Sequence, residues 1–181
     1  FSVGTLPVTG GAAFEYRLFK PITLIFNAAK VYRQPTLNEL YWMPGGNNNL
    51  KAEQGYTFEG GANYKKQLKD FFFQFTGAIY SREIENWILW IPSQNGSSSA
   101  INIQKVWSRG SETTLKLNYQ KNKIKLSSSV MTSYVLSTIH ASQQENNNTL
   151  NKQLIYTPRY LLNANLSVGL HNIYFIFYHQ Y

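Results

Sequence analysis

The sequence contains no cysteine and a single aspartate, Asp70. The absence of cysteine excludes a disulfide scaffold, thiolate zinc sites and cysteine nucleophiles. Three histidines, His140, His171 and His179, lie in unrelated segments. Because calcium and magnesium sites need several carboxylates close together, and this chain has few, we predict neither a metal site nor a cofactor.

Charged residues are scarce, at 14% of the chain, although 17 lysines and arginines against 9 aspartates and glutamates give a formal charge of +8. A nucleic-acid-binding protein usually gathers its positive charge on one face. Here the lysines are spread over many segments and no arginine-rich face is visible, so we predict no nucleic-acid partner. Lysines near short turns are better explained by positions at a lipid headgroup border or in a lumen.

Long apolar runs are also missing, since the longest is Ile173–Tyr178. A membrane-spanning helix needs about 18 or more apolar residues, so any membrane-spanning segment must be a strand. Gly45-Gly46 lacks the Gly-Lys-Ser/Thr of a phosphate-binding loop, and no Ser/His/acid spacing points to a hydrolase. We therefore predict no catalytic residue and no enzymatic activity.

The sequence does show a regular alternation of apolar and polar residues. Over Asp70–Arg82 the odd positions are apolar from Phe71 to Ile79, and most even positions after Phe72 are polar. A period of two is typical of β-strands whose two faces meet different surroundings. Such segments predict about eight strands, at 11–20, 22–33, 54–66, 70–83, 103–120, 123–140, 153–169 and 172–181.

The connections between these segments predict the topology. Short turns at 20–21, 66–69, 120–123 and 170–172 alternate with long polar loops at 34–53, 92–102 and 141–152. An antiparallel up-and-down meander, with turns at one rim and loops at the other, produces this order. The predicted fold class is therefore all-β.

The apolar face could meet lipid or a second sheet. A soluble β-sandwich would carry charged residues on its outer face, whereas the polar residues here are mainly Ser, Asn, Thr and Gly. Long strands with aromatic residues near their ends favour a transmembrane barrel. We expect a lumen-facing set of Glu59, Asn63, Glu112, Asn163 and Asn165, and a lipid-facing set of Phe73, Phe75, Leu115, Leu117, Leu162 and Leu166.

The small polar residues of one face would leave a closed eight-stranded barrel under-filled. We therefore expect residues 1–181 to form a single unit, a contiguous arc of a larger barrel. Phe1 begins without a secretory signal and Tyr181 ends within a strand-like run. Both ends are those expected of a piece of a longer chain.

A motif over residues 31–53 carries a resemblance to a known family. Its residues are Arg33, Pro35, Thr36, Leu37, Glu39 and Leu40, followed by Gly46, Asn47, Leu50 and Glu53. This pattern resembles TonB-dependent outer-membrane receptors. Arg109-Gly110-Ser111-Glu112 is similar to a second motif of that family, and Tyr156-Thr157-Pro158-Arg159 to its proline-marked strand entry. The resemblance is nearest to the vitamin B12 and ferric-siderophore branch.

The resemblance implies a barrel of about 22 strands with a plug in its lumen, in the outer membrane of a Gram-negative bacterium. It implies as partners outer-membrane lipid, the receptor's own plug domain and the TonB energy-coupling complex, with a scarce nutrient such as cobalamin or a ferric siderophore as small-molecule ligand. The chain would cover roughly strands thirteen to twenty, without the plug and the final strands. A passive pore or adhesion barrel, and a soluble β-sandwich binding domain, remain alternatives.

The first motif also has a physical interpretation. Pro35 has no N–H and ends strand pairing, while Pro44-Gly45-Gly46 predicts a tight turn with glycine at positive φ. Leu37, Leu40 and Leu50 predict a small apolar base for an ordered loop. Each motif residue could either stabilise the structure of this loop or contact the substrate directly. The candidate ligand-binding residues are the loop aromatics and amides Tyr41, Trp42, Asn47, Asn48, Trp87, Trp90, Gln94 and Asn95.

Overall fold

In a computed structural model, which describes residues 7–92, 96–141 and 150–181, the chain forms one antiparallel sheet with strands in sequence order. The strands are β1 (Gly10–Phe19), β2 (Ile22–Arg33), β3 (Glu53–Leu68), β4 (Phe71–Pro92), β5 (Ser98–Lys121), β6 (Ile124–Ala141), β7 (Tyr160–Leu170) and β8 (Ile173–Gln180). Within the described strands, β1 and β8 each have one neighbour, so the sheet is an open arc. The predicted up-and-down meander of eight strands is confirmed.

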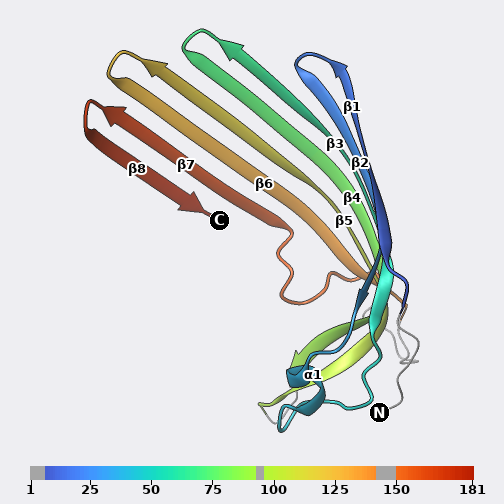
Figure 1. Ribbon diagram of the computed structural model, residues 1–181. Helices are drawn as coiled ribbons and strands as arrows, with labels where there is room; N and C mark the ends of the chain where they lie inside the picture. The colour runs from blue at the N-terminus through green and yellow to red at the C-terminus, as the bar shows by residue number, and fades with distance from the viewer. Residues whose placement is uncertain (1–6, 93–95, 142–149) are drawn as a thin grey trace.

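The connections lie at two opposite ends of the curved sheet (Figure 1). The hairpin turns gather at one end, and the long connections lie at the other together with α1 (Leu37–Tyr41). Lys69, Asn122 and His171 begin three of the tight turns with φ angles of 43°, 52° and 57°. A left-handed residue allows a two-residue connection to reverse the chain.

Strand pairing sorts the side chains onto two faces, because residues directly opposite each other point to the same side. Glu59 pairs with Tyr80, Tyr80 with Gly110, and the same alternation continues to β7. One face, called the polar face below, carries Glu59, Asn63, Glu112, Asn163 and Asn165. The opposite, apolar face carries Phe73, Phe75, Leu115, Leu117, Leu162 and Leu166. The two predicted sets therefore lie on opposite sides of the sheet.

Strand β8 departs from this division. Its pairing with β7 puts Tyr174, Ile176 and Tyr178 on the polar face. Phe175 and Phe177 lie on the apolar face and are 59% and 61% exposed. Both faces of this strand are therefore apolar or aromatic, which the alternation elsewhere does not predict.

The apolar face is exposed rather than packed against a second layer. Phe26, Phe58 and Ile79 are 49%, 57% and 69% exposed. Two hydroxyl groups on this face bond to each other, in the 2.7 Å hydrogen bond between Thr113 and Thr132. Internal pairing of polar groups is what a hydrocarbon environment requires.

Among the residues that the structure describes, helical structure is limited to the single turn of α1, which the sequence did not predict. Within the described ranges, no helix is long and apolar enough to cross a membrane.

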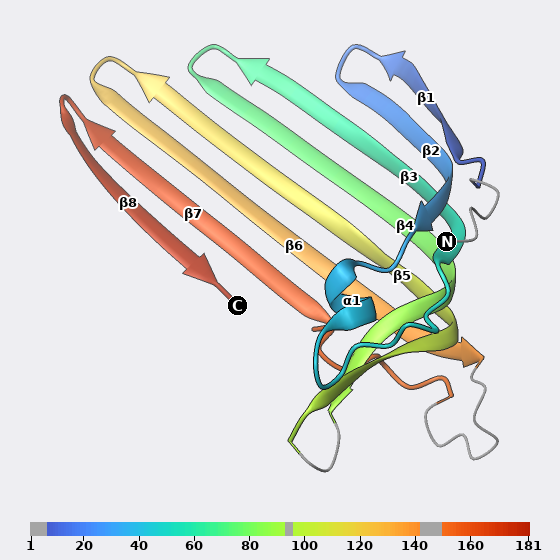
Figure 2. The ribbon, with the colours of Figure 1, turned by 60° about the horizontal axis from the view of Figure 1, so that its bottom comes forward.

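The buried apolar cluster lies at the loop end of the sheet, where β4 and β5 extend beyond their neighbours. Ile103, Val106 and Leu154 are buried there, with Trp87, Leu89 and Ile139 packed around them. The strands predicted at 70–83 and 103–120 are therefore too short, since β4 runs to Pro92 and β5 starts at Ser98, inside the predicted loop 92–102. We call residues 84–92 and 96–103 the hairpin extension; Figure 2 shows it beside α1.

The predicted start of a strand at residue 153 is also wrong, because β7 begins at Tyr160. Leu154 is buried in the cluster instead, and its N–H donates to the Ser137 carbonyl at 2.8 Å. Tyr156 has a φ of 59°, and Pro158 has no N–H to donate to a ladder. Leu154 packs on the buried cluster, while the backbone of this segment still bonds to β6, as in the isolated bridge between Gln153 and Thr138.

Candidate functional site

The loop between β2 and β3 begins with a capped helical turn. Thr36 Oγ1 accepts a hydrogen bond from the Glu39 N–H at 3.2 Å, and Glu39 Oε2 accepts one from the Thr36 N–H at 2.7 Å. This reciprocal capping box satisfies two backbone donors that the start of a helix would otherwise leave free. It explains locally why Thr and Glu stand three residues apart in the motif.

The guanidinium of Arg33 joins this helical turn to the neighbouring strand. Its Nε and Nη2 donate to the two oxygens of Glu53 at 2.7 Å each, and Nη1 donates to Glu39 at 2.9 and 3.1 Å. Glu53 Oε1 also accepts the backbone N–H of Ile88 at 2.8 Å. The motif residues Arg33, Glu39 and Glu53 thus form one network that ties together β2, α1, β3 and β4.

The charge state of this network follows from its partners. Burial alone would raise the pKa of the Glu39 carboxyl, but the hydrogen bonds from Arg33 and Thr36 outweigh it and leave that pKa below its usual value. The carboxylates of Glu39 and Glu53 are only 12% and 13% exposed, whereas the Arg33 side chain is 41% exposed. Glu39 therefore stays ionised beside Arg33 at neutral pH.

The middle of the loop docks on the hairpin extension through backbone contacts. The Gly45 carbonyl accepts the Ala100 N–H at 2.9 Å, and a Cβ on Gly45 would lie 1.7 Å from the Ser98 carbonyl oxygen. Neither Gly45 nor Gly46 has a positive φ, so the prediction of left-handed glycines here is wrong. Gly45 is needed because no side chain fits between the loop and β5.

Asn47 makes three hydrogen bonds that order the loop between β2 and β3. Its side-chain amide donates to the Ala100 carbonyl at 3.2 Å, its Oδ1 accepts the Asn49 N–H at 2.9 Å, and its own N–H donates to the Glu39 carbonyl at 2.8 Å. Of the predicted apolar base, Leu40 and Leu50 are half-buried, but Leu37 is 75% exposed and does not belong to it.

Two amide residues that the sequence did not single out fix the loop's far end. Asn102 donates from Nδ2 to the Lys51 and Asn86 carbonyls at 3.0 and 2.6 Å, and its Oδ1 accepts the Lys51 N–H at 2.7 Å. Asn86 has a φ of 56° and donates to the Ala52 carbonyl at 3.3 Å. The tolerance of Asn for this conformation was the only signal in the sequence.

In the second motif, Arg109-Gly110-Ser111-Glu112, the glycine allows close packing on the polar face. A Cβ on Gly110 would lie 2.1 Å from the Tyr134 carbonyl oxygen and 2.8 Å from the Tyr80 hydroxyl oxygen. The Tyr80 ring therefore lies across Gly110, where any larger residue would collide with it. Glu112 follows Gly110 by two residues on β5, so it lies on the same face, and its side chain is exposed.

The predicted ligand-binding residues fall into separate groups. Trp42 and Trp90 line one cavity of about 470 Å³ together with Asn38, Pro44, Ser97 and Ser98. Trp87 instead lines a smaller cavity beside Arg33 and Arg82. The other predicted residues do not join them: Tyr41 and Asn48 are exposed outside these cavities, Asn47 is used within the loop, and Gln94 and Asn95 lie outside the described residues.

The Trp42–Trp90 cavity, as we call it, offers two indole rings with amide and hydroxyl groups beside them. Such a surface suits a flat, partly apolar molecule oriented by a few hydrogen bonds. Across the part of the chain that the structure describes, no group of three His, Cys, Asp or Glu side chains is placed to hold a metal ion.

The fold and the loop together define an arc of a β-barrel with one apolar face, one polar face and an ordered connection at its rim. The family model described as TonB dependent receptor-like, beta-barrel, matches residues 3–178, and the chain belongs to this family. The predicted resemblance is thereby confirmed. The family is one of receptors and transporters.

One curated relative is also similar to this chain. The vitamin B12 transporter BtuB of Photobacterium profundum is 31% identical over 106 residues. The alignment covers 56% of this chain and 17% of the relative. The chain therefore spans only a small part of the length of that transporter.

Proposed function

We propose that this chain is part of the barrel of an outer-membrane receptor that imports a scarce nutrient, with cobalamin as the first candidate and a ferric siderophore as the second. Residues 1–181 would form a single unit, one arc of a barrel whose plug and remaining strands lie elsewhere in the protein. The location would be the outer membrane of a Gram-negative bacterium. The match of the family model over residues 3–178 carries this proposal.

The two faces of the sheet support the membrane location. An exposed face of Phe, Leu and Ile suits lipid, and the opposite face of Ser, Asn and Thr suits a lumen with a plug. The partners proposed on this basis are outer-membrane lipid, the plug domain, the TonB complex and a small-molecule ligand. The name of the similar Photobacterium protein favours cobalamin among the ligands.

The ordered loop supports a role in ligand capture. The Arg33 network and the Gly45 contact hold α1 and the hairpin extension together, and this places Trp42 and Trp90 on one cavity. In this proposal the two indoles contact the ligand, and Asn38 and Ser98 orient it. Tyr41, Asn48 and Trp87 lie outside the cavity and are not part of the proposed contact.

The ligand proposal is tested by binding to the full-length receptor that contains this chain. The probes are cyanocobalamin and a ferric hydroxamate siderophore, measured by isothermal titration in detergent. For the bound probe, Trp42→Ala and Trp90→Ala should each weaken affinity about tenfold, as is typical for an aromatic anchor. Trp107→Ala is the control, because Trp107 lies on the apolar face and stacks with Arg109.

Failure of both probes to bind would contradict the proposed ligands, and equal effects of all three tryptophan substitutions would contradict the proposed cavity. A passive pore or adhesion barrel is the alternative function. It predicts that ligand entry into cells does not change when the TonB complex is deleted, whereas the import proposal predicts that entry is lost.

A further inference from the structure

The net positive charge of the chain is concentrated at one end of the sheet, where Figure 1 shows the hairpin turns. The hairpin rim, as we call these turns and the strand ends beside them, begins at the pairing row of Lys65, Gln74 and Lys116. It comprises residues 20–21, 65–74, 116–129 and 165–178. The hairpin rim contains eight of the 17 basic residues of the chain and one of its 9 acidic residues, so it holds nearly all of the formal charge of +8.

The lysines of the hairpin rim are exposed and have no counter-charge in the described chain. They are Lys20, Lys65, Lys66, Lys69, Lys116, Lys121, Lys123 and Lys125. None of them forms an ion pair with a residue that the structure describes, and neither does the one acidic residue there, Asp70. Because like charges that lie close together repel, an anionic partner at this end would stabilise the receptor.

Strand pairing directs these lysines to both sides of the sheet. Lys66, which pairs with Phe73, and Lys121 lie on the apolar face. Lys65, the preceding residue, and Lys125 lie on the polar face. Two lysines therefore border the surface that the membrane proposal turns toward lipid, and two others at nearly the same height border the lumen.

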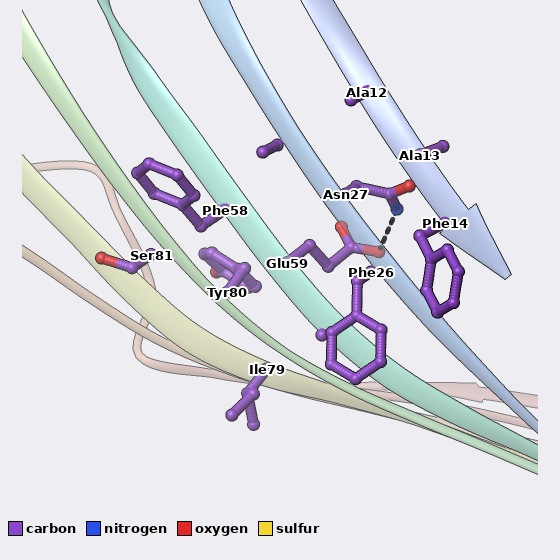
Figure 3. Close-up of a pocket in the computed structure, with 12 residues that line it drawn as sticks. Ala12, Ala13, Phe14, Phe26, Asn27, Phe58, Glu59, Ile79, Tyr80 and Ser81 are labelled. Atoms are coloured by element: carbon purple, nitrogen blue, oxygen red, sulfur yellow. Dashed lines mark hydrogen bonds between the residues drawn. The ribbon is translucent and has the colours of Figure 1, made fainter. Parts of the chain in front are cut away.

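The apolar face is uncharged between the hairpin rim and the loop end. Figure 3 shows Phe14, Phe26 and Ile79 extending from the middle of the sheet in one direction, away from the hydrogen bond between Asn27 and Glu59. Within the described strands, this part of the apolar face carries no lysine, arginine, aspartate or glutamate. Charge on the apolar face is thus confined to its two ends.

The spacing of these two charged ends places Lys66 at the border of the hydrocarbon. The next charge toward the loop end is Arg109, which pairs with Ser81. Ser81 lies eight residues from Phe73, the partner of Lys66, which is about 26 Å along a strand. A membrane-crossing strand has about 9–11 residues, so Lys66 and Arg109 lie near opposite borders. The rings of Tyr64 and Phe73, 5.7 Å apart, lie beside Lys66, as is typical of the aromatic girdle at a membrane interface.

We propose that Lys66 and Lys121, on the apolar face of the hairpin rim, bind phospholipids whose headgroups carry a net negative charge, such as phosphatidylglycerol. The short turns of a transmembrane barrel lie on its periplasmic side, where the leaflet consists of phospholipids. The lipid phosphate meets the ammonium groups, and the lysine stems lie along the apolar surface below them. A zwitterionic headgroup is a poorer ligand, because its own ammonium would meet further lysines and only one carboxylate, that of Asp70.

The position of these lysines favours a lipid over a soluble acidic protein. Leu68, Phe71 and Tyr119 form one apolar row across β3, β4 and β5 on the apolar face. Lys66 lies on the inner side of this row, two residues from Leu68, so an acidic protein at the turns would have to cross apolar surface to reach it. The lysines also extend from the first hairpin to the third, about 19 Å across the sheet, which is a strip along the membrane border rather than a pocket.

The inference rests on the proposed membrane location, and the two can fail separately. A full-length receptor that stays monodisperse without detergent would overturn the membrane location. Loss of the headgroup preference in a receptor that still requires detergent would overturn only the lipid site.

The experiment uses the full-length receptor in phosphatidylcholine vesicles. The probes are trace amounts of phosphatidylglycerol, phosphatidylethanolamine and phosphatidylcholine that carry the same photoactivatable group at the headgroup end of one acyl chain. After illumination and pepsin digestion, mass spectrometry measures labelling of peptides that cover residues 62–73 and 117–126. Phosphatidylglycerol should label them roughly fivefold more than either zwitterionic lipid, the size expected for one lysine near an anionic headgroup. The preference should shrink in 1 M salt.

Two double variants with the same change of charge provide the matched comparison. Lys66→Gln combined with Lys121→Gln should abolish the preference for phosphatidylglycerol. Lys65→Gln combined with Lys125→Gln should leave it within a factor of two, because these side chains lie on the polar face. Lys66→Arg combined with Lys121→Arg should retain the preference, since the positive charges remain.

Equal labelling by phosphatidylglycerol and phosphatidylcholine in the unmodified receptor would overturn the lipid site and leave the hairpin rim to an acidic protein. Labelling by phosphatidylethanolamine equal to that by phosphatidylglycerol would overturn the requirement for net negative charge. An equal loss of preference in the two glutamine double variants would also contradict the proposal, because it would assign the effect to total charge rather than to lysines on the apolar face.

Discussion

Replacement of Arg33 by methionine tests the network that orders the loop between β2 and β3. Arg33 donates four hydrogen bonds to two carboxylates that are only 12% and 13% exposed. Removing one partner of a buried ion pair costs about 3–5 kcal/mol. Because the Arg33 side chain is 41% exposed and water can reach the site, we expect about 2–3 kcal/mol for opening of the loop.

This loss is measured by hydrogen exchange of peptides spanning 34–53 in the full-length receptor. Arg33→Met should raise their exchange rates by about 30- to 150-fold, since 1.36 kcal/mol corresponds to a factor of ten. Lys105→Met is the control, because the Lys105–Glu83 pair is exposed and should contribute about 0–1 kcal/mol. A change below about threefold for Arg33→Met, or one equal to that of the control, would refute the role given to the network.

Three further predictions address the same chain. The pKa of Glu39 is lowered in the fold, so the ionised Glu39 carboxylate stabilises the loop fully above the ordinary pKa of about 4.3. This stabilisation is lost as the pH falls through the lowered pKa. Protease cleavage of the loop should therefore rise below about pH 4 and stay constant between about pH 5 and 8. Gly110→Ala should destabilise the full-length receptor by about 2 kcal/mol or more, because the new Cβ would lie 2.1 Å from a carbonyl oxygen. Gly60→Ala, the control, should change stability by less than about 0.5 kcal/mol. Urea unfolding in lipid vesicles measures both changes. In the same assay Phe75→Arg on the apolar face should cost ~2–4 kcal/mol, and Asn163→Ala on the polar face about 1 kcal/mol or less; equal losses would contradict the assignment of the faces.

The sheet could be predicted from the sequence wherever its two faces meet different surroundings. Along β3 and the first part of β4, strict alternation identifies both the strand and its face, as Phe73 and Asn63 show. The hairpin extension could not be predicted in this way. Its apolar run around Trp87 and Trp90 is covered on one side by the loop at Gly45 and on the other by Leu154, and a strand covered on both faces does not alternate.

The candidate site was predictable in its residues but not in its connections. The motif singled out Arg33, Thr36, Glu39 and Glu53, yet their contacts depend on the pairing of Arg33 with Glu53 across β2 and β3. Likewise Trp42 and Trp90 are 48 positions apart and share a cavity only because the loop docks on β5. Local patterns carry the chemistry of these side chains, while long-range pairing decides which of them meet.

The central claim is that the sheet is an arc of a membrane barrel with one face toward lipid and the other toward the lumen. Single cysteines for spin labels are introduced at Phe73, Gln74, Phe75 and Thr76 of the full-length receptor in lipid vesicles, with any cysteine outside this chain replaced beforehand, since residues 1–181 contain none. Collision with oxygen, which concentrates in hydrocarbon, should be high for labels at Phe73 and Phe75 and low at Gln74 and Thr76. Equal collision rates at all four positions, or the reverse alternation, would contradict the account.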